Sequence, residues 1–243
     1  MNTQTCCPVV ELRQYTLHPG MRDTLIELFD REFVESQEAT GMVVIGQFRD
    51  MDNPDRFVWL RGFEDMQTRA RALQKFYGGP VWKAHREAAN ATMIDSDDVL
   101  LLRPAYSGPG FSLAKATRPP YGSTDSARGL LVATIYHLRE ATGFDFPNFF
   151  ERELRPIVEQ TGASVLASFV TENHPNTFPR LPVREDANVF VWFSFFSNRA
   201  ALEQHAAAFA VLMDQRQRKL SELIKGQPEV LLLAPTARSL LHK

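Results

Sequence analysis

Apolar residues run almost unbroken through the segment NVFVWFSFF, residues 188–196. A strand with one face in water alternates between apolar and polar residues, whereas a strand covered on both faces reads as a continuous apolar run. Residues 55–63, DRFVWLRGF, repeat the same Phe-Val-Trp core in the first half of the chain. The pattern therefore predicts two equivalent strands, and the second of them is covered on both faces.

These two strands belong to a longer internal repeat. The offset is 121 between Tyr15 and Tyr136, and it is 131 between VLLLRP at 99–104 and VLLLAP at 230–235. An ordered series of matches, with insertions confined to a few places, indicates duplication. The main insertion falls in the proline-rich segment 172–187.

Each half shows the same predicted order of elements, strand-helix-strand-strand-helix-strand. In the first half we predict strands at 8–17, 42–49, 56–63 and 99–103, and helices at 20–39 and 65–93. In the second half we predict strands at 130–138, 164–171, 188–196 and 229–234, and helices at 145–161 and 197–225. Gly41 and Gly162 stand where a helix end favours a left-handed residue. This βαββαβ order is that of the ferredoxin-like unit.

A four-stranded sheet with helices on one face leaves its other face bare, and two such sheets can cover each other. We therefore predict an α+β fold, in which two tandem ferredoxin-like units pack sheet to sheet as an internal pseudo-dimeric α/β barrel. The predicted domains are residues 1–104 and 128–243, joined by a Pro- and Gly-rich linker at 105–127. A pair of independent domains, each covered by another chain, stays open as an alternative.

Polar side chains recur at every second position of the first-half strands. Residues two apart in a strand share a face, so Trp59 and Arg61 lie together, opposite Val58 and Leu60. Because the face against the helices is expected to be apolar, we assign the polar face to the space between the sheets. The residues assigned to this space are Glu11, Arg13, Tyr15, Gln47, Arg49, Trp59 and Arg61, with Tyr136 and Trp192 from the second half.

The charges of this set leave two interpretations open. One is a pocket for an anionic or phenolic small molecule, with arginines pairing its charge and tryptophans lining it. The other is that Glu11 and the arginines neutralise one another inside the barrel. Three arginines against one glutamate leave positive charge without a partner, which favours the pocket.

His85 is the best candidate for a general base, because a helix beside the barrel mouth could point it inward. Glu11 is the second candidate for moving a proton. The second half has no histidine equivalent to His85, which fits either a single site or an idle surface residue. The run RARALQK, residues 69–75, is interpreted as a solvated helix face. Gly78-Gly79-Pro80 is predicted to break the second helix.

Composition and motifs exclude several classes of function. The net charge of −2 does not favour nucleic-acid or membrane binding, and the longest apolar runs are too short to span a bilayer. No signal-peptide pattern opens the chain, and the adjacent Cys6 and Cys7 cannot join distant parts of the fold, so we expect a reduced, cytoplasmic protein. No metal-ligand spacing, GxGxxG, Walker or GxSxG motif occurs, so we predict no metal and no cofactor.

Three segments, VVELRQYTLHPG (9–20), RFVWLRGFEDMQTRARAL (56–73) and YGGPVWKAHREAANATM (77–93), resemble the NIPSNAP family of the dimeric α/β-barrel group. Arg69 and Trp82 also match the expected pattern, whereas the third strand has Trp-Leu-Arg where the family usually has His-Leu-Trp. The second half matches loosely. The resemblance implies a ferredoxin-like barrel and, by analogy, cofactor-free quinol-type monooxygenases. Some barrel relatives bind haem through one histidine.

Two functions follow as hypotheses. The first is a metal-free oxidoreductase or isomerase for a phenol or quinol, in which arginines hold a phenolate or an enolate and His85 or Glu11 moves a proton. The second is a non-catalytic module for small-molecule binding or protein interaction. In that case segment 172–187 is the expected docking element or pocket lid. Pairing of two chains as a homodimer is compatible with both.

Overall fold

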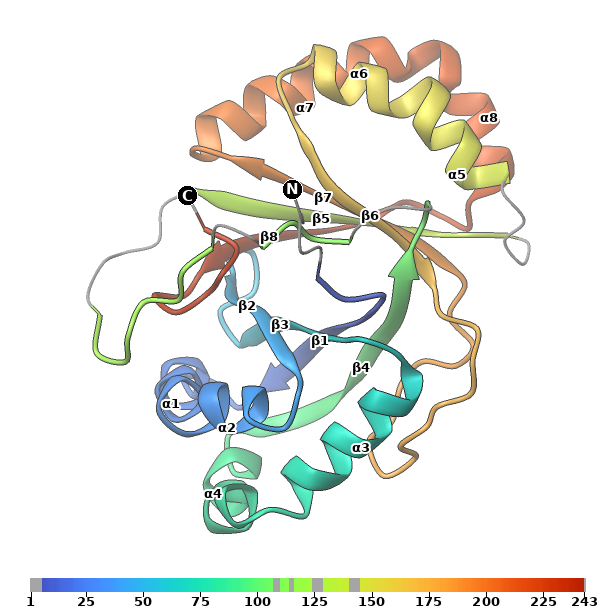
Figure 1. Ribbon diagram of the computed structural model, residues 1–243. Coiled ribbons are helices and arrows are strands. Elements are labelled where there is room, and N and C mark those ends of the chain that lie inside the picture. The colour runs from blue at the N-terminus through green and yellow to red at the C-terminus, as the bar shows by residue number, and fades with distance from the viewer. Residues whose placement is uncertain (1–5, 107–109, 114–115, 124–128, 140–144, 243) are drawn as a thin grey trace.

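A single closed barrel combines the strands of both halves of the chain (Figure 1). The computed structural model describes residues 6–242 except 107–109, 114–115, 124–128 and 140–144. Within these residues the strand order around the barrel is β1-β3-β2-β8-β5-β7-β6-β4. All neighbouring strands pair antiparallel. Helices cover the barrel on two opposite sides, α1 to α4 on one and α5 to α8 on the other (Figure 1).

The order of elements is the same in the two halves. The first half contains β1 (Val9–Leu17), α1 (Arg22–Leu28), the π-helical segment η1 (Phe29–Phe33), α2 (Val34–Glu38), β2 (Val43–Asp50), β3 (Arg56–Phe63), α3 (Met66–Tyr77), α4 (Pro80–Asn90) and β4 (Met93–Pro104). The second half contains β5 (Leu130–His137), α5 (Asp145–Phe149), the π-helical η2 (Phe150–Leu154), α6 (Arg155–Gln160), β6 (Val165–Thr171), β7 (Val189–Phe196), α7 (Arg199–Met213), the 3₁₀ turn η3 (Asp214–Arg216), α8 (Gln217–Leu223) and β8 (Glu229–Pro235).

Local sequence signals fix several ends of these elements. Gly41 and Gly162 have φ of +98° and +94°, as predicted for the ends of the first helical stretches. The predicted helix break is also confirmed, since α3 ends at Tyr77 and α4 begins at Pro80. Asp65 caps α3, because its side chain accepts a hydrogen bond from the Thr68 N–H.

Two strand pairs join the halves. At one seam β2 pairs with β8, with Phe48 opposite Pro235. At the other seam β4 pairs with β6, with Leu102 opposite Thr171. The halves therefore form one continuous wall, and the edge strands of each half are paired with the other half.

The space between the two sheets is filled by apolar side chains. Val10, Leu12, Val58 and Leu60 of the first half, all buried, belong to one cluster with buried residues of the second half, among them Ala133, Ile135, Val191 and Phe193. The strand of residues 188–196 is thus covered on both faces as predicted, because its alternate residues Phe190, Trp192 and Phe196 pack against helices.

The predicted direction of the polar face is wrong. Tyr15 and Trp59 pack in the cluster formed with helices α1, η1 and α3, and not inside the barrel. Arg61 is hydrogen-bonded to Gln37 of α2, and Glu11 is paired with Arg69 of α3. The alternation of the strands grouped these residues correctly, but the polar group faces the helices. These residues therefore form no pocket between the sheets. The apolar residues on the opposite face of the same strands fill the barrel.

A bulge in β2 also breaks the predicted alternation. The pairing register of β2 with β3 shifts between Val44 and Gly46. As a result Ile45 and Phe48 both point into the barrel cluster, although they are three residues apart. Gln47 lies on the helix side, where its side chain contacts Asp30.

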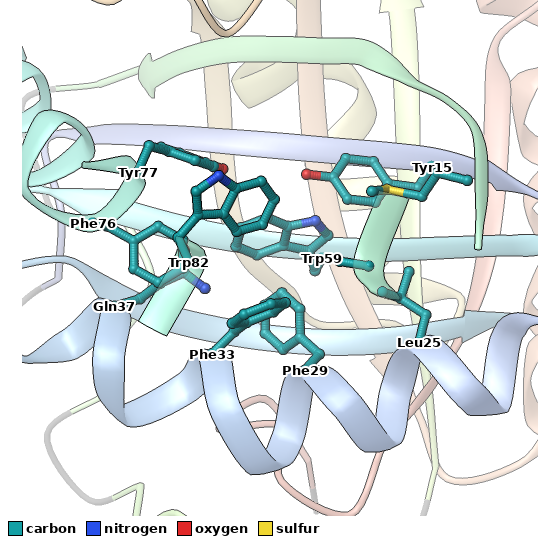
Figure 2. Close-up of a pocket in the computed structure, with 11 residues that line it drawn as sticks. Tyr15, Leu25, Phe29, Phe33, Gln37, Trp59, Phe76, Tyr77 and Trp82 are labelled. Atoms are coloured by element: carbon teal, nitrogen blue, oxygen red, sulfur yellow. The ribbon is translucent and has the colours of Figure 1, made fainter. Parts of the chain in front are cut away.

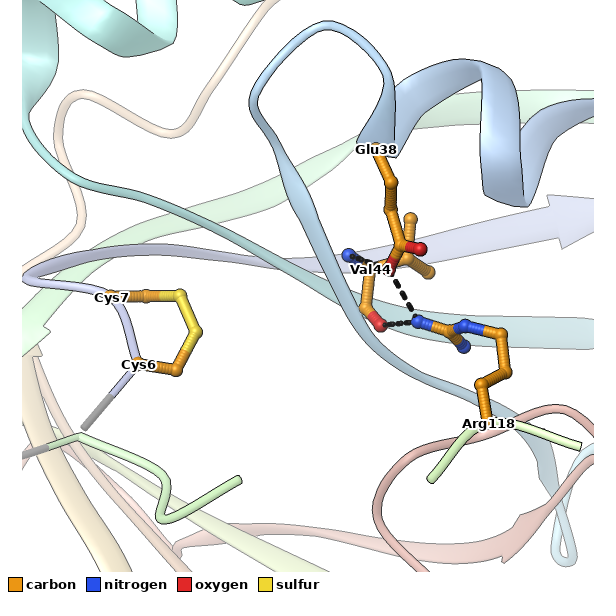
Figure 3. The surroundings of a disulfide bond; sticks show 5 residues. All are labelled: Cys6, Cys7, Glu38, Val44 and Arg118. Carbon is orange, nitrogen blue, oxygen red and sulfur yellow. Dashed lines mark hydrogen bonds and ion pairs between the residues drawn. A yellow bond between two sulfur atoms is a disulfide. The ribbon is translucent and has the colours of Figure 1, made fainter. Parts of the chain in front are cut away.

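The described part of the linker is packed against the barrel. Phe111 is buried in the barrel cluster, where its ring lies 5.2 Å from that of Phe169. Arg118 donates hydrogen bonds to Glu38 and to the Val44 carbonyl (Figure 3). It also donates to the carbonyl of Arg238 near the C-terminus. The linker is therefore part of the contact between the two halves.

Cys6 and Cys7 form a disulfide between adjacent residues at the start of the described chain (Figure 3). The structure thus joins two cysteines that the sequence analysis expected to be reduced. The bond closes a two-residue ring and joins no distant elements, as expected from the sequence. Among the described residues, no helix is both long and apolar enough to cross a membrane.

Candidate functional site

A buried carboxylate at the centre of the first-half sheet is bound by three arginines. Glu11 Oε2 accepts from Arg13 Nη1 at 2.7 Å and from Arg61 Nε at 2.8 Å, and its Oε1 accepts from Arg69 Nε at 2.7 Å. All four side chains are 0% exposed. β1, β3 and α3 supply them, so the cluster ties the sheet to its helical layer.

The charges of this cluster do not balance. Burial acts to raise the pKa of Glu11, but Arg61, Arg13 and Arg69 outweigh it and hold that pKa well below its ordinary range. Glu11 is therefore ionised and fully engaged, which makes it a poor proton acceptor. Since arginine stays protonated in proteins, three cations face one anion, and the cluster has an excess of two positive charges.

An aromatic cavity lies beside the cluster, between the outer face of β1 and β3 and the helices (Figure 2). It encloses about 350 Å³, the solvent at its mouth included. Its interior is narrow, with room for about one or two water molecules. The lining residues are Tyr15, Leu25, Phe29, Phe33, Gln37, Trp59, Phe76, Tyr77, Trp82, Ala89 and Met93.

The arginines reach this cavity through its polar lining residues. Arg13 Nε donates to Tyr15 Oη at 3.0 Å, and Arg61 Nη1 approaches Tyr77 Oη at 3.4 Å. The two guanidinium groups also lie 5.6 and 5.0 Å from the ring of Trp59. Both tyrosine oxygens accept from a cation, so each keeps its own O–H proton to donate to a ligand.

The geometry of these groups favours hydrogen-bond donation into the cavity. Burial raises the pKa of Tyr15, which keeps its hydroxyl neutral. Figure 2 shows the hydroxyls of Tyr15 and Tyr77 directed toward each other. The indole Nε1 of Trp59 is buried and has no hydrogen-bond partner among the described residues. The equivalent Nε1 of Trp192 in the second half is also buried without a partner among the described residues, so the ligand argument depends on the cavity and its charges.

The structure places the other predicted site residues away from this cavity. Gln47 donates to buried Asp30 at 3.3 Å. Arg49 is 36% exposed and pairs with Asp23. His85 lies on α4, where its Nε2 is 3.4 Å from Glu32 Oε2 of η1 in the helical layer. The expectation that His85 points into the barrel mouth is therefore wrong, although it contacts Phe33, a lining residue.

Tyr136 and Trp192 occupy the equivalent place in the second half, where they pack against phenylalanine rings. The ring of Tyr136 lies 5.1 Å from that of Phe146, and the ring of Trp192 lies 5.6 Å from that of Phe150. The second half has Val132 and Thr134 at the positions of Glu11 and Arg13. Neither residue reaches the first-half cavity, so the two halves do not share one pocket.

Several residues of the site lie in the first helical layer, which the sequence reasoning did not assign to it. They are Phe29, Phe33, Gln37, Arg69, Tyr77 and Trp82. The interpretation of residues 69–75 as a solvated face is wrong for Arg69. Its spacing from Ala72, Leu73 and Phe76, which are all buried, follows one face of a helix. That spacing is the feature of the sequence that could have predicted the burial of Arg69. Among the described residues, no group of three or more His, Cys, Asp or Glu could hold a metal ion.

The architecture and the buried layer between sheet and helices define a protein of the α/β-barrel class. Residues 10–109 match the family model of the NIPSNAP domain, as the motifs of this region indicated. This domain includes the Glu11 cluster and every residue that lines the cavity. No curated protein matches the chain.

Solved structures match the whole chain in fold. A candidate monooxygenase from Lactobacillus acidophilus NCFM is 14% identical, with a TM-score of 0.56 over 94% of both chains. A candidate monooxygenase from Fusobacterium nucleatum is 10% identical, with a TM-score of 0.56 over 95% of this chain and 93% of its own. An anthrone oxidase-like protein is 10% identical, with a TM-score of 0.56 over 97% and 94%. At these identities the likeness shows the barrel fold alone.

Proposed function

We propose that the NIPSNAP domain binds a small aromatic oxyanion, a phenolate or an enolate, in the cavity between its sheet and its helices. The observation that carries the proposal is the pairing of aromatic walls with a buried excess of positive charge. Tyr15 and Tyr77 line the cavity and also accept hydrogen bonds from arginines of the cluster. A phenolate oxygen at this place would accept from the tyrosines and from Trp59 Nε1, and its charge would reduce the imbalance.

Entry of such a ligand requires movement of the helical wall, because the cavity has room for only one or two waters. α4 is the element best suited to move. Among the residues of α4 only Ala89 is buried, and the helix directly follows the Gly78–Gly79 junction. Trp82 on α4 lines the cavity and is partly exposed. A small outward shift of α4 would widen the cavity without disturbing the barrel.

The activity that we propose for this site is oxidation of the bound phenol by dioxygen. The fold neighbours described as candidate monooxygenases and as anthrone oxidase-like support it by analogy. For a hydroquinone, two electrons and two protons pass to O₂, which leaves as H₂O₂ while the ring becomes a quinone. The arginine cluster would favour the electron-rich anion, and the aromatic walls would keep water from it.

A non-catalytic binding module is the second candidate, and one observation favours it. The lining of the cavity contains no carboxylate, histidine or lysine within the described residues, so no ordinary general base faces the ligand. The proton of a bound phenol would then pass to water. In this case the pocket stores or senses an aromatic anion and does not convert it.

Tryptophan fluorescence offers a direct test. The chain has three tryptophans, of which Trp59 and Trp82 line the cavity. In a Trp192→Phe parent, the remaining emission comes from these two indoles. We expect 4-nitrophenolate to quench it saturably, and 4-nitroanisole, which cannot ionise, to bind more weakly.

Tyr15→Phe should weaken 4-nitrophenolate binding about tenfold, because a hydrogen bond to a charged group is worth about 1.5 kcal/mol. It should leave 4-nitroanisole binding unchanged. Tyr136→Phe is the matched control, since it removes the equivalent hydroxyl of the second half. Equal effects of the two variants, or no saturable quenching in the parent, would contradict the proposed site.

Oxygen uptake with hydroquinone, measured against the spontaneous rate, separates the enzyme from the binding module.

We propose that residues 1–104 and 128–243 are ferredoxin-like units that arose by duplication. The strand orders β4-β1-β3-β2 and β8-β5-β7-β6 support this, because they correspond position by position. We further propose that the protein is cytoplasmic and that two chains pair as a homodimer.

A further inference from the structure

We infer that the loop of residues 172–187, which belongs to the second half, is a working part of the first-half site. The loop positions Arg69 and Tyr77, and it closes the side of the cavity that Tyr77 forms. The inference rests on the proposed function for the nature of the ligand, but its contacts do not depend on it. Figure 1 shows this segment, after β6, running beside β4 as far as α3.

The loop supplies the outer partners of Arg69. Arg69 Nε is bound to Glu11, and its Nη1 donates to Asn176 Oδ1 at 3.0 Å and to Thr177 Oγ1 at 3.2 Å. The Thr177 hydroxyl in turn donates to the Met66 carbonyl at the start of α3, at 3.0 Å. Both partners of Nη1 are neutral. The loop therefore fixes the guanidinium without cancelling its charge.

The loop also packs against the wall of the cavity. The ring of Phe178 stacks on that of Tyr77, with 5.9 Å between centroids and 23° between planes. Phe178, Leu181 and Val183 join the apolar cluster between the sheet and helices of the first half. Because the Tyr77 hydroxyl contacts Arg61 and its ring lines the cavity, Phe178 acts on the site through Tyr77.

Hydrogen bonds to β4 and within the loop hold the segment in a defined conformation. At its start the Glu172 N–H bonds to the Leu101 carbonyl at 2.8 Å, and further on the Arg184 N–H bonds to the Val99 carbonyl at 2.9 Å. Asn176 orders the tip, since its Oδ1 accepts from the Phe178 N–H at 3.0 Å. β4 thus carries the loop to a fixed place over α3.

This arrangement gives a role to the principal difference between the halves. The turn between β2 and β3 spans residues 51–55, whereas the equivalent connection between β6 and β7 spans 172–188. The second half has neutral residues at the positions of Glu11 and Arg13, and it carries the longer loop. After duplication, one half thus kept the charged site and the other supplied its cover.

The cover is tested first without any ligand. In the Trp192→Phe parent, acrylamide quenching reports how open the cavity is to solvent at Trp59 and Trp82. Phe178→Ala should raise the quenching constant roughly twofold by removing one side of the packing around Tyr77. Phe178→Tyr keeps the ring and should match the parent. Circular dichroism and urea unfolding establish that each variant is folded.

The positioning of charge is tested by Asn176→Asp. The new carboxylate can accept from Arg69 and lowers the net charge of the cluster by one. We expect 4-nitrophenolate affinity to fall about fivefold, as for an added charge interaction of about 1 kcal/mol. Affinity for 4-nitroanisole should not change. Asn173→Asp is the matched control, because it makes the same substitution at an exposed residue of the same loop.

The outcomes separate the inference from the proposed function. If Phe178→Ala opens the cavity to acrylamide but the parent does not bind 4-nitrophenolate, the loop is a cover and the proposed ligand is wrong. If the parent binds 4-nitrophenolate, but Phe178→Ala and Asn176→Asp change neither access nor affinity, the inference is overturned. A loss of both probes in Asn176→Asp would indicate a structural role and would also overturn the charge argument.

Discussion

Glu11 holds together a cluster whose other members repel one another. Its two oxygens accept from Arg13, Arg61 and Arg69, and none of these side chains contacts solvent. Removing one partner of a buried ion pair leaves uncompensated charge, which costs about 3–5 kcal/mol. We therefore expect Glu11→Gln to lower the free energy of unfolding by about this amount, measured by urea denaturation. Glu32→Gln, at a partly exposed pair with Arg31, should change it by less than about 1 kcal/mol.

The same carboxylate gives the stability a predictable dependence on pH. Its folded-state pKa is held well below its unfolded value of about 4.3, so folding favours the ionised form. This contribution is present above the unfolded pKa and is lost as the pH falls toward the folded pKa. Stability should therefore decline steeply below about pH 4 in the natural chain. The decline should be shallower in Glu11→Gln, and parallel curves would contradict the assignment.

Single residues also show the limit of prediction from the sequence. Alternation correctly places Trp59 and Arg61 on one face, but it does not tell which face meets the helices. We expected charged residues to be absent from the layer between the sheet and the helices. They are tolerated there because they form ion pairs with one another, and Arg69 of the facing helix α3 supplies one of these pairs. Only the pairing of a helix residue with a strand residue decides the direction. A single sequence does not contain that information.

Among the elements, the helical stretches that begin each half show a detail that the sequence pattern did not reveal. Each is interrupted by a π-helical segment, Phe29–Phe33 in the first half and Phe150–Leu154 in the second, at the repeat offset of 121. In the first half this segment places Phe29 and Phe33 on the cavity. A π-helical turn at a functional site is a common association. The breaks at glycine and proline were predictable, whereas this widening of the helix was not.

Asp30 in the first π-helical segment provides a prediction for this element. Burial raises its pKa to about 6, against the lowering effect of Arg238. Its side chain accepts from Gln47, and its carbonyl accepts from Arg238. The folded state therefore favours the protonated acid, and this contribution to stability is lost as the pH rises through about 6.

Asp30→Asn keeps the shape and an oxygen acceptor for Gln47 but cannot ionise. We expect it to stabilise the protein at pH 8 by on the order of 2 kcal/mol, and to flatten the stability curve between about pH 4 and 6. Asp23→Asn is the control, because Asp23 is an exposed partner of Arg49. Urea unfolding at a series of pH values measures both. A destabilised Asp30→Asn at pH 8 would show that the ionised carboxylate is required.

At the scale of the whole molecule, the internal repeat made the barrel predictable. The strands of both halves close into one barrel, and its interior is an apolar cluster shared by the two halves. The two seams were not predictable, because edge pairing depends on backbone hydrogen bonds and leaves little mark on the sequence. The packing of Phe111 from the linker into that cluster was missed for a related reason. A single aromatic residue among prolines and glycines carries no periodicity.

The seams lead to a prediction about the first half alone. Its β2 pairs with β8, and its β4 pairs with β6, so each edge strand of one half meets the non-equivalent edge of the other. This is the pattern that a two-fold dimer of one half would repeat.

A fragment of residues 1–104 would otherwise expose both edges and the apolar face that includes Val58 and Leu60. We expect it to form a folded dimer, measured by light scattering after gel filtration. Leu60→Asp in the fragment should abolish the dimer, and a folded monomer would show that one half does not need the barrel.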